Sequence, residues 1–418
     1  MLPSMFSAIS GLRGHQIMLD VIANNIANVN TVGYKTGRVS FQDILSETLR
    51  GATAPSGNLG SINPAQIGLG MTVAGIDMMM TQGNLQSTNK LTDMAIQGDG
   101  FFVLADGAQQ SFTRDGAFDI AVDGSLVNPA SGLKVQGWAA DAQGVIDTTA
   151  PIGSLAIPIG QQTTAQASTA ITIRGNLDAN VAVGATASTS ISLYDSLGVA
   201  HAVKVTYTKA AANSWTWAAA TDPADTGAST LSTGTIDFTN AGQVDPLNPP
   251  TGTLSIALTN GAVTPLAFDP ALVPATLDMT SMTQFAGTSE PLGAADGFAS
   301  GTLVTFAVNN GGEITGVYSN GQTQALGQIA LATFLNSSGL LRGGQNMFNE
   351  SNASGGPSIG IPGSGSRGDI TTGSLEMSNV DLATQFTGMI TAQRGFQANG
   401  RVITTSDEVL QELVNLKR

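Results

Sequence analysis

The sequence predicts a mainly β fold with long terminal α-helices: nested antiparallel β-domains lie between an N-terminal and a C-terminal helix that pair as a coiled coil. Three observations support this fold class. Apolar residues recur at intervals of seven near both ends of the chain, which keeps one face of a helix directed at a partner. Between the ends, short apolar and polar alternations are separated by Asp-Gly and Asn-Gly turn signals. A block rich in Ala, Thr and Ser interrupts this pattern, which then resumes, so an inserted domain is expected.

Two helices are expected, at about residues 3–27 and 381–416, and we call their seven-residue stripes the two seams. The first seam comprises Met5, Ile9, Leu12, Leu19, Ala23 and Ile26, and the second comprises Leu382, Phe386, Met389, Phe396, Ile403, Leu410 and Val414. A single antiparallel pair leaves much of these stripes uncovered, so we expect neighbouring copies of the chain to cover them. The heptads alone fit a coiled coil within one chain or a closed dimer as well as an open polymer.

The sequence pattern divides the chain into four nested parts. Residues 1–30 with 376–418 form a terminal helical domain. Residues 31–70 with 352–375 form a linker region, in which 32–50 are irregular and the Gly-rich stretches 51–70 and 352–368 are loops. Residues 71–144 with 288–351 form the first β-domain, and residues 145–287 form an inserted, outer second β-domain. Such an order requires both ends of the chain to meet.

The expected strands are short runs bounded by Gly, Asn, Asp or Pro, as in a β-sandwich or barrel. In the first β-domain they cover residues 101–104, 302–308, 313–318 and 328–334, and in the second 171–173, 191–193, 203–207, 215–217 and 254–258. Trp215 and Trp217 occupy alternate positions, which places both on one face of a strand. We expect this face to pack in a core.

Composition excludes several classes of function. The 418 residues carry a formal net charge of −14 and no basic run, so nucleic acid is not an expected partner. No apolar stretch is long enough to span a membrane, so no membrane insertion is expected. The N-terminal residues lack the pattern of a cleaved secretory signal. Because the chain has no cysteine, it forms no disulfide.

Motifs typical of enzymes occur only in unsuitable contexts. Residues 356–360 fit G-x-S-x-G, but a proline occupies the elbow, and the two histidines, His15 and His201, lie far upstream. Residues 363–368 fit G-x-G-x-x-G within a low-complexity loop that lacks a βαβ context. We therefore predict no catalytic residue, no cofactor and no metal, and expect a structural protein rather than an enzyme.

Motifs at both ends and in the middle of the chain resemble those of the bacterial flagellar rod and hook family. The N-terminal run Asn24-Asn25-Ile26-Ala27-Asn28 leads to Gly33-Tyr34-Lys35, and the C-terminal counterpart contains Asn379-Val380-Asp381 and Gln393-Arg394. Residues 93–102 and 112–118 are also similar to the family. Residues 175–178, 194–198, 318–321 and 326–334, together with the chain length, resemble the hook branch in particular.

The resemblance implies a subunit that self-assembles into the flagellar hook, a flexible tubular joint that transmits torque from rod to filament. It implies terminal helices that form the inner tube and β-domains that form outer layers. It further implies export through the flagellar type III apparatus without a cleaved signal, an extracellular location, and contacts with the distal rod, the hook cap and the hook–filament junction proteins. The alternatives are a distal rod or hook-like axial component, or a β-rich adhesive or carbohydrate-binding module, which an aromatic content of 5% disfavours.

Overall fold

The computed structural model describes residues 2–52, 54–55, 61, 63–107, 109–141, 144–160, 162–222, 225, 227–230, 232–263, 266–268 and 276–415. The chain divides into two compact units. The first unit comprises Met1–Pro158, Phe306–Gly316 and Gln324–Arg418, and the second comprises Ile159–Thr305 and Val317–Thr323. Residues 416–418, at the end of the expected C-terminal helix, lie outside the described residues.

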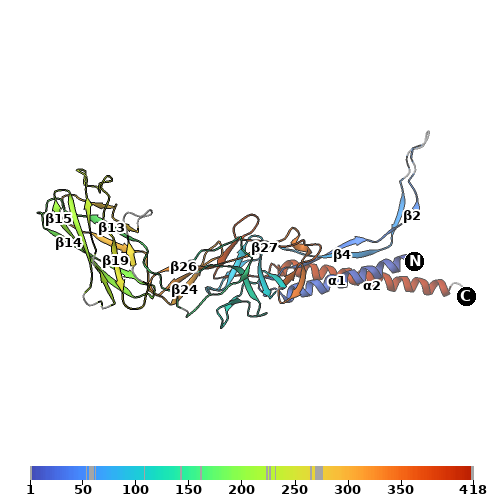
Figure 1. Cartoon of the computed structure of the whole chain (residues 1–418). Coiled ribbons are helices and arrows are strands. Elements are labelled where there is room, and N and C mark those ends of the chain that lie inside the picture. The colour runs from blue at the N-terminus through green and yellow to red at the C-terminus, as the bar shows by residue number, and fades with distance from the viewer. Residues whose placement is uncertain are drawn as a thin grey trace. The chain divides into compact units, whose positions relative to one another are not determined.

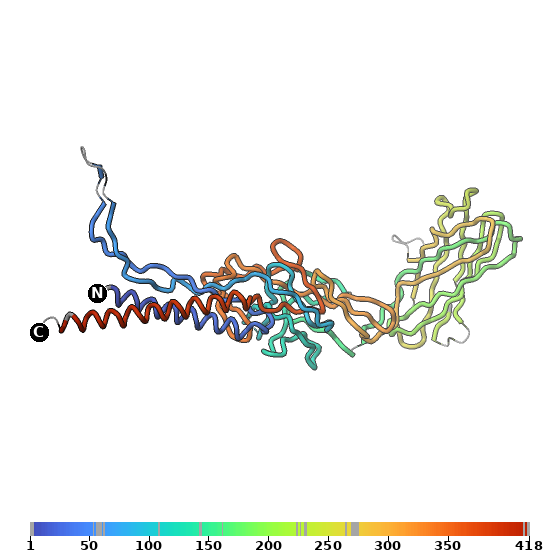
Figure 2. Tube along the Cα trace, turned by 180° about the vertical axis from the view of Figure 1, so that it is seen from behind, coloured from blue at the N-terminus to red at the C-terminus, as the bar shows by residue number. Residues whose placement is uncertain are grey.

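The first unit contains both helices, α1 (Leu2–Ala27) and α2 (Leu382–Asn415), which lie side by side with both chain ends at the same side (Figures 1 and 2). Its strands are β1 (Gly37–Asp43), β2 (Ser46–Arg50), β3 (Ala65–Gly68), β4 (Met71–Met78), β5 (Leu85–Ser87), β6 (Met94–Gln97), β7 (Phe101–Asp106), β8 (Gln109–Thr113), β9 (Asp119–Ile120), β10 (Leu126–Val127), β11 (Lys134–Ala139), β12 (Gly153–Ser154), β27 (Leu331–Thr333), β28 (Leu341–Gly344), β29 (Met347–Asn349), β30 (Ser358–Gly360), β31 (Asp369–Thr372) and β32 (Ser374–Glu376). A 3-10 turn, η1, covers Ser337–Gly339. Three strands each contain residues of both units: β24 (Leu303–Val308), β25 (Glu313–Tyr318) and β26 (Thr323–Ile329).

The central sheet of the first unit has the order β26-β11-β7-β8-β29-β28. The expected strand at residues 101–104 is β7, whose buried apolar side chains form part of the core. Phe101 packs edge-on against Phe348 of β29, with ring centroids 5.6 Å apart, and Phe112 of β8 packs against Phe334 at 4.8 Å. This aromatic core holds the C-terminal strands against the N-terminal ones.

The second unit is built entirely from strands among its described residues. They are β13 (Ile171–Asn176), β14 (Thr186–Tyr194), β15 (Ala200–Ala211), β16 (Ser214–Thr221), β17 (Ala228–Thr230), β18 (Ser232–Asp237), β19 (Leu254–Leu258), β20 (Leu266–Phe268), β21 (Leu277–Asp278), β22 (Met282–Thr283) and β23 (Leu292–Ala295). The sheets β14-β15-β16-β18 and β17-β19-β20 enclose one core. Trp215 and Trp217 are buried in it, which confirms the prediction from their alternate positions.

The expectation of an irregular linker was wrong for much of residues 31–70. Strands β1, β2 and β3 lie there, and β30 interrupts the loop expected over 352–368. Strand β1 pairs with β4 in antiparallel register from Gly37↔Met78 to Asp43↔Met71, with a bulge between Ser40 and Phe41. The bulge breaks the alternation of apolar and polar residues, and the partner strand is distant in sequence, so the local pattern concealed the strand.

Two further differences from the expected fold concern the second unit. It runs from Ile159 to Thr305, whereas the expected boundaries were 145 and 287. Strand β23 belongs to it because residues Leu292–Ala295 pair with β13. The nested sheets are also not wholly antiparallel, since β13 pairs in parallel with β21 and with β22.

Neither helix, within the residues that the structure describes, is long and apolar enough to cross a membrane. The same residues contain no group of three or more His, Cys, Asp or Glu side chains placed to hold a metal ion.

Candidate functional site

The candidate site is the helix pair together with what we call the junction. The junction lies at the C-terminal end of α1 and the N-terminal end of α2, where residues of both terminal motifs meet. The helices run antiparallel, because successive contacts advance on α1 while they recede on α2. A Cβ on Gly11 would lie 2.7 Å from the amide of Asn399, and one on Gly395 would lie 2.5 Å from His15. Further along, Asn25 Nδ2 donates to Gln385 Oε1 at 3.1 Å. These pairs define what we call the contact line.

The contact line does not run through the two seams, which differs from the expected coiled-coil arrangement. Small residues make the close approach possible: a Cβ on Gly388 would meet Ile22 at 3.3 Å, and Ala8 and Ala392 are buried. Small side chains let two helix backbones approach closely, so the larger seam residues are left at the sides of the pair. Gly400 is not part of this close approach, since a Cβ there would meet no atom within 4 Å.

The seam residues are half-buried or exposed in the single chain. On α1, Met5, Leu12, Leu19 and Ile26 are half-buried and Ile9 and Ala23 are exposed. On α2, Met389, Ile403 and Leu410 are half-buried and Leu382, Phe386, Phe396 and Val414 are exposed. The side chains of Phe386 and Phe396 keep 50% and 41% of their accessible surface. Much of both apolar stripes therefore remains uncovered.

Both seams lie on the same side of the helix pair. Successive helix residues are about 100° apart, which puts each seam about a quarter of a turn from the contact line, in the same rotational sense on both helices. Because the helices are antiparallel, an equal displacement on each brings the seams to one common side. We call this combined surface the apolar face. It joins residues from the two ends of the chain.

Asn25, from the N-terminal motif, is the polar centre of the junction below the helices. Its side chain is buried and both ends of its amide are paired. Oδ1 accepts from the Gly37 N–H at 3.0 Å and from the Tyr34 hydroxyl at 3.1 Å, and Nδ2 donates to the Gly37 carbonyl at 2.8 Å. With the bond to Gln385, this side chain fixes α1, strand β1 and α2 relative to one another.

Replacing Asn25 by alanine is expected to destabilise the first unit by about 2–3 kcal/mol, because several buried polar groups lose their partner together. Chemical denaturation of the monomer measures this change. Asn24→Ala is the matched control, since Asn24 is exposed and its side chain bonds only locally, to Asn28. Equal losses from both substitutions would contradict the role given to Asn25.

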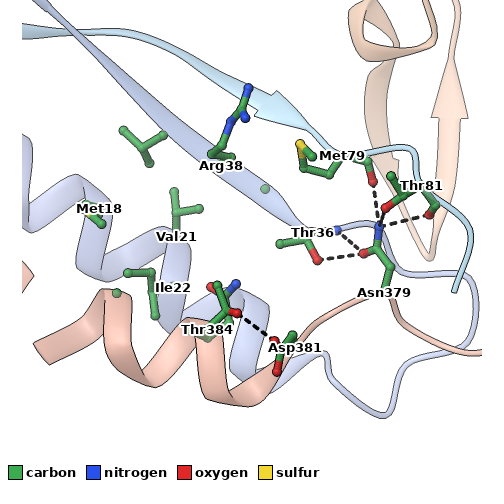
Figure 3. Close-up of a pocket in the computed structure, with 14 residues that line it drawn as sticks. Met18, Val21, Ile22, Thr36, Arg38, Met79, Thr81, Asn379, Asp381 and Thr384 are labelled. Carbon is green, nitrogen blue, oxygen red and sulfur yellow. Dashed lines mark hydrogen bonds between the residues drawn. The ribbon is translucent and has the colours of Figure 1, made fainter. Parts of the chain in front are cut away.

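Asn379, from the C-terminal motif, plays the corresponding part on the other side of the junction (Figure 3). Its Oδ1 accepts from the backbone N–H and the hydroxyl of Thr36 at 2.8 and 2.7 Å. Its Nδ2 donates to the Met79 carbonyl at 2.8 Å and to Thr81. Asp381 caps α2 by accepting from the Thr384 hydroxyl and the Ala383 N–H, and these bonds hold the pKa of the Asp381 carboxyl below its usual range.

Three buried charged side chains link the two segments that flank the helices to the residues after β8. Lys35 Nζ lies 2.6 Å from Glu376 Oε1, and Arg114 Nη1 lies 3.3 Å from Glu376 Oε2. Lys35 also donates to the Thr81 carbonyl, and the Gly83 N–H donates to Glu376. Burial lowers the pKa of the Lys35 ammonium, although the charge of Glu376 opposes this shift. Lys35 belongs to the predicted motif, whereas sequence reasoning missed Glu376, which has no distinguishing neighbours in the sequence.

The remaining motif residues shape the chain or face solvent. Gly33 has φ of +68°, and a Cβ there would lie 2.7 Å from the Asp115 nitrogen, so the turn requires glycine. Val380 is half-buried, and Asn28 bonds to Asn24 one turn earlier. Ala27, Gln393 and Arg394 are exposed. The exposed positions contribute no contact that fixes the junction, so the structure brings together only part of the predicted motif set.

A pocket of about 350 Å³ lies between α1, the start of α2 and strand β1 (Figure 3). Met18, Val21 and Ile22 give it an apolar wall, and Thr36 and Asn379 lie on its polar side. Its polar groups are engaged in the hydrogen bonds that hold the junction together. The pocket therefore belongs to a structural joint between helices and strands rather than to a reaction centre.

Four family models match successive parts of the chain. They are described as "Flagella basal body rod protein" (residues 5–35), "Flagellar hook protein FlgE/F/G D1 domain" (95–182), "Flagellar basal body protein FlaE D2 domain" (161–298) and "Flagellar basal body rod FlgEFG protein C-terminal" (371–416). The first and last of them contain the two terminal motifs.

Full-length relatives decide between the branches of the family. The flagellar hook protein FlgE of Borreliella burgdorferi is 42% identical to this chain, and that of Treponema pallidum is 39% identical, each over the whole of both chains. The chain belongs to the flagellar hook protein family. This hook-family chain is accordingly a structural subunit and not an enzyme. The crystal structure of the Helicobacter pylori flagellar hook protein FlgE2 matches 70% of it and 100% of that chain with a TM-score of 0.53 at 14% identity, which shows a shared fold.

Proposed function

We propose that copies of this chain assemble into the tubular hook by covering the apolar face of α1 and α2, and that the tube transmits torque from rod to filament as a flexible joint. The main support for the proposal is that the two seams lie on the same side of the helix pair. A stable monomer rarely leaves a continuous apolar stripe in water. Neighbouring helix pairs of the same kind would cover it with coiled-coil packing between copies.

The energetics favour assembly through this face. Complete burial of one large apolar side chain contributes about 1.5–3 kcal/mol, and Leu382, Phe386 and Phe396 are each exposed in the single chain. Several such residues per copy are enough to offset the loss of freedom on association. Contacts between different patches of neighbouring copies form an open helical tube when the rotation between successive copies does not close a ring.

The division of the chain suggests a place for each part in the tube. The terminal helical domain, residues 1–30 with 376–418, would form the inner tube, and the β-rich units would form the layers around it. We extend the proposal to export by the flagellar type III apparatus, to an extracellular location, and to contacts with the distal rod, the hook cap and the hook–filament junction proteins. A distal rod or hook-like axial component is the second candidate, favoured by the rod-protein models that match both ends.

Placing a charge in either seam is expected to prevent tube formation. Leu19→Asp and Phe396→Asp each put a carboxylate where a neighbouring copy would exclude water, and an unpaired buried charge is strongly unfavourable. Electron microscopy of purified protein under precipitant measures the outcome, with tubes expected from the unaltered chain and none from either variant. Circular dichroism is expected to show that the β-rich units remain folded.

Asn24→Asp and Ala398→Asp are matched controls, because both positions are exposed and lie outside the seams. Tubes of normal appearance from the seam variants would refute the proposed interface. Small closed particles from the unaltered chain would favour a closed oligomer instead of a polymer.

A further inference from the structure

In the second unit, the buried ring of His201 is held between two carboxylates. Its Nδ1 lies 2.7 Å from Asp225 Oδ2, and its Nε2 lies 3.1 Å from Asp195 Oδ2. The side chains of His201 and Asp195 are 1% and 0% exposed, and that of Asp225 is 18% exposed. Both ring nitrogens are therefore engaged, and the ring has little access to solvent.

With both carboxyls ionised, this geometry requires the doubly protonated ring. An ionised carboxylate only accepts hydrogen bonds, so each ring nitrogen must donate, and a neutral imidazole carries one N–H. Asp195 is kept ionised by further donors: the N–H groups of Leu197 and Val199, both at 2.9 Å, and the side-chain amide of Asn260. Burial favours the neutral carboxyl, but these donors outweigh it and lower the pKa of Asp195.

The same cluster connects three loops. His201 opens strand β15, opposite Leu193 of β14, and Asp195 begins the turn between these strands. Asp225 lies in the loop after β16 and also accepts from the Gly227 N–H at 3.0 Å. Asn260 follows β19, which belongs to a different sheet from β15. The charged histidine thus ties the two sheets of the unit together at one end.

We propose that His201 is a proton-dependent clasp, which holds Asp195, Asp225 and Asn260 together while the ring is doubly protonated and releases them when rising pH removes one proton. Without that proton, one ring nitrogen would present a lone pair to a carboxylate, and the two carboxylates would lie close together without a cation between them. The charges that act on the ring are those of Asp225 and Asp195.

The direction of the pH effect follows from these contacts. Burial lowers the pKa of His201, but the hydrogen bonds and charges of Asp225 and Asp195 outweigh it, so the pKa is raised above its ordinary value of 6.5. Stability from the clasp is therefore fully present below 6.5 and is lost as pH rises through the raised pKa. At the acid end, the contribution of Asp195 is lost as pH falls through its lowered pKa.

Proton NMR of the full-length monomer tests the clasp, because the chain has two histidines and a His15→Gln variant assigns the remaining ring signals to His201. The ring signals of His201 are expected to titrate with a midpoint above 6.5. Amide protection factors, which remove the intrinsic pH dependence of exchange, are expected to fall about tenfold or more at Leu197, Val199 and Gly227 over the same pH range, as for the loss of a charge-assisted hydrogen bond.

Two variants separate the clasp from general effects of pH. Asp225→Asn is expected to lower the titration midpoint of His201, and His201→Gln is expected to abolish the pH-dependent loss of protection in the loops. Asp237→Asn, the matched control, removes the same charge near the opposite end of β15, since Asp237 pairs with Ser214. A midpoint at or below 6.5, or the same loop opening in His201→Gln, would overturn the proposal. If His201→Gln does not fold, the titration of the unaltered chain decides alone.

Discussion

Replacing Glu376 by glutamine is expected to lower the free energy of unfolding of the first unit by about 3–5 kcal/mol. Its carboxylate lies between two buried cations, Lys35 and Arg114, and a neutral amide leaves both without the negative charge that contacts them. The substitution preserves the size of the side chain, so the loss is electrostatic rather than steric. Guanidinium unfolding of the monomer, followed by amide exchange in β5 to β7, measures the change in the unit that contains the cluster.

Glu350→Gln provides the comparison, because it removes the same charge from an exposed position of the first unit. We expect it to change stability by less than about 0.5 kcal/mol, as for most surface substitutions. If Glu376→Gln were equally mild, the two cations would not depend on this carboxylate, and the cluster would lose its role in joining the chain ends.

Replacing Trp217 by alanine is expected to lower the free energy of unfolding of the second unit by about 3–5 kcal/mol. The indole is buried in the core between the two sheets, and its N–H donates to the Thr251 carbonyl at 3.1 Å. The backbone of Gly234 packs against the ring, since a Cβ there would lie 2.6 Å from the indole nitrogen. A glycine has no side chain that can move into the cavity, so little of the loss is recovered.

Amide exchange resolved by segment distinguishes the two units in this experiment. Protection in β14 to β16 is expected to fall, and protection in β7 and β8 is expected to stay unchanged because the core around Trp217 lies within the second unit. Leu247→Ala is the control, since Leu247 is 88% exposed in the same unit. An equal fall in both units would show that they unfold together.

The helices and most core strands could be predicted because their signals are local. The heptads of α1 and α2 placed both helices within one or two residues of their observed bounds, and the alternation around Trp215 indicated a buried strand face. Strand β1 was missed because its register contains a bulge at Phe41 and its partner, β4, is not adjacent in sequence. The parallel pairings of β13 were missed for the same reason, since no turn signal marks them.

The candidate site could be predicted as a set of motif residues but not as an arrangement. Asn25 and Asn379 were named from the family motifs, yet their hydrogen bonds depend on segments brought together from opposite ends of the chain. The heptads identified which helix residues are apolar. They did not indicate that glycines and alanines would form the contact between the two helices. That outcome depends on how closely two particular helix backbones can approach, which the period of the pattern does not specify.

The junction between the two helices affects the order in which the parts of the chain can fold. Lys35 and Glu376 are 341 residues apart in the chain, and Asn25 and Gln385 are 360 apart. Closing a flexible loop of that length has a large entropic cost, which falls once the second unit has folded and drawn its own ends together. We therefore expect the junction to form after the second unit has folded. A chain that stops before residue 376 lacks both Glu376 and α2, so only a chain that extends through α2 can complete the junction and present the proposed apolar face.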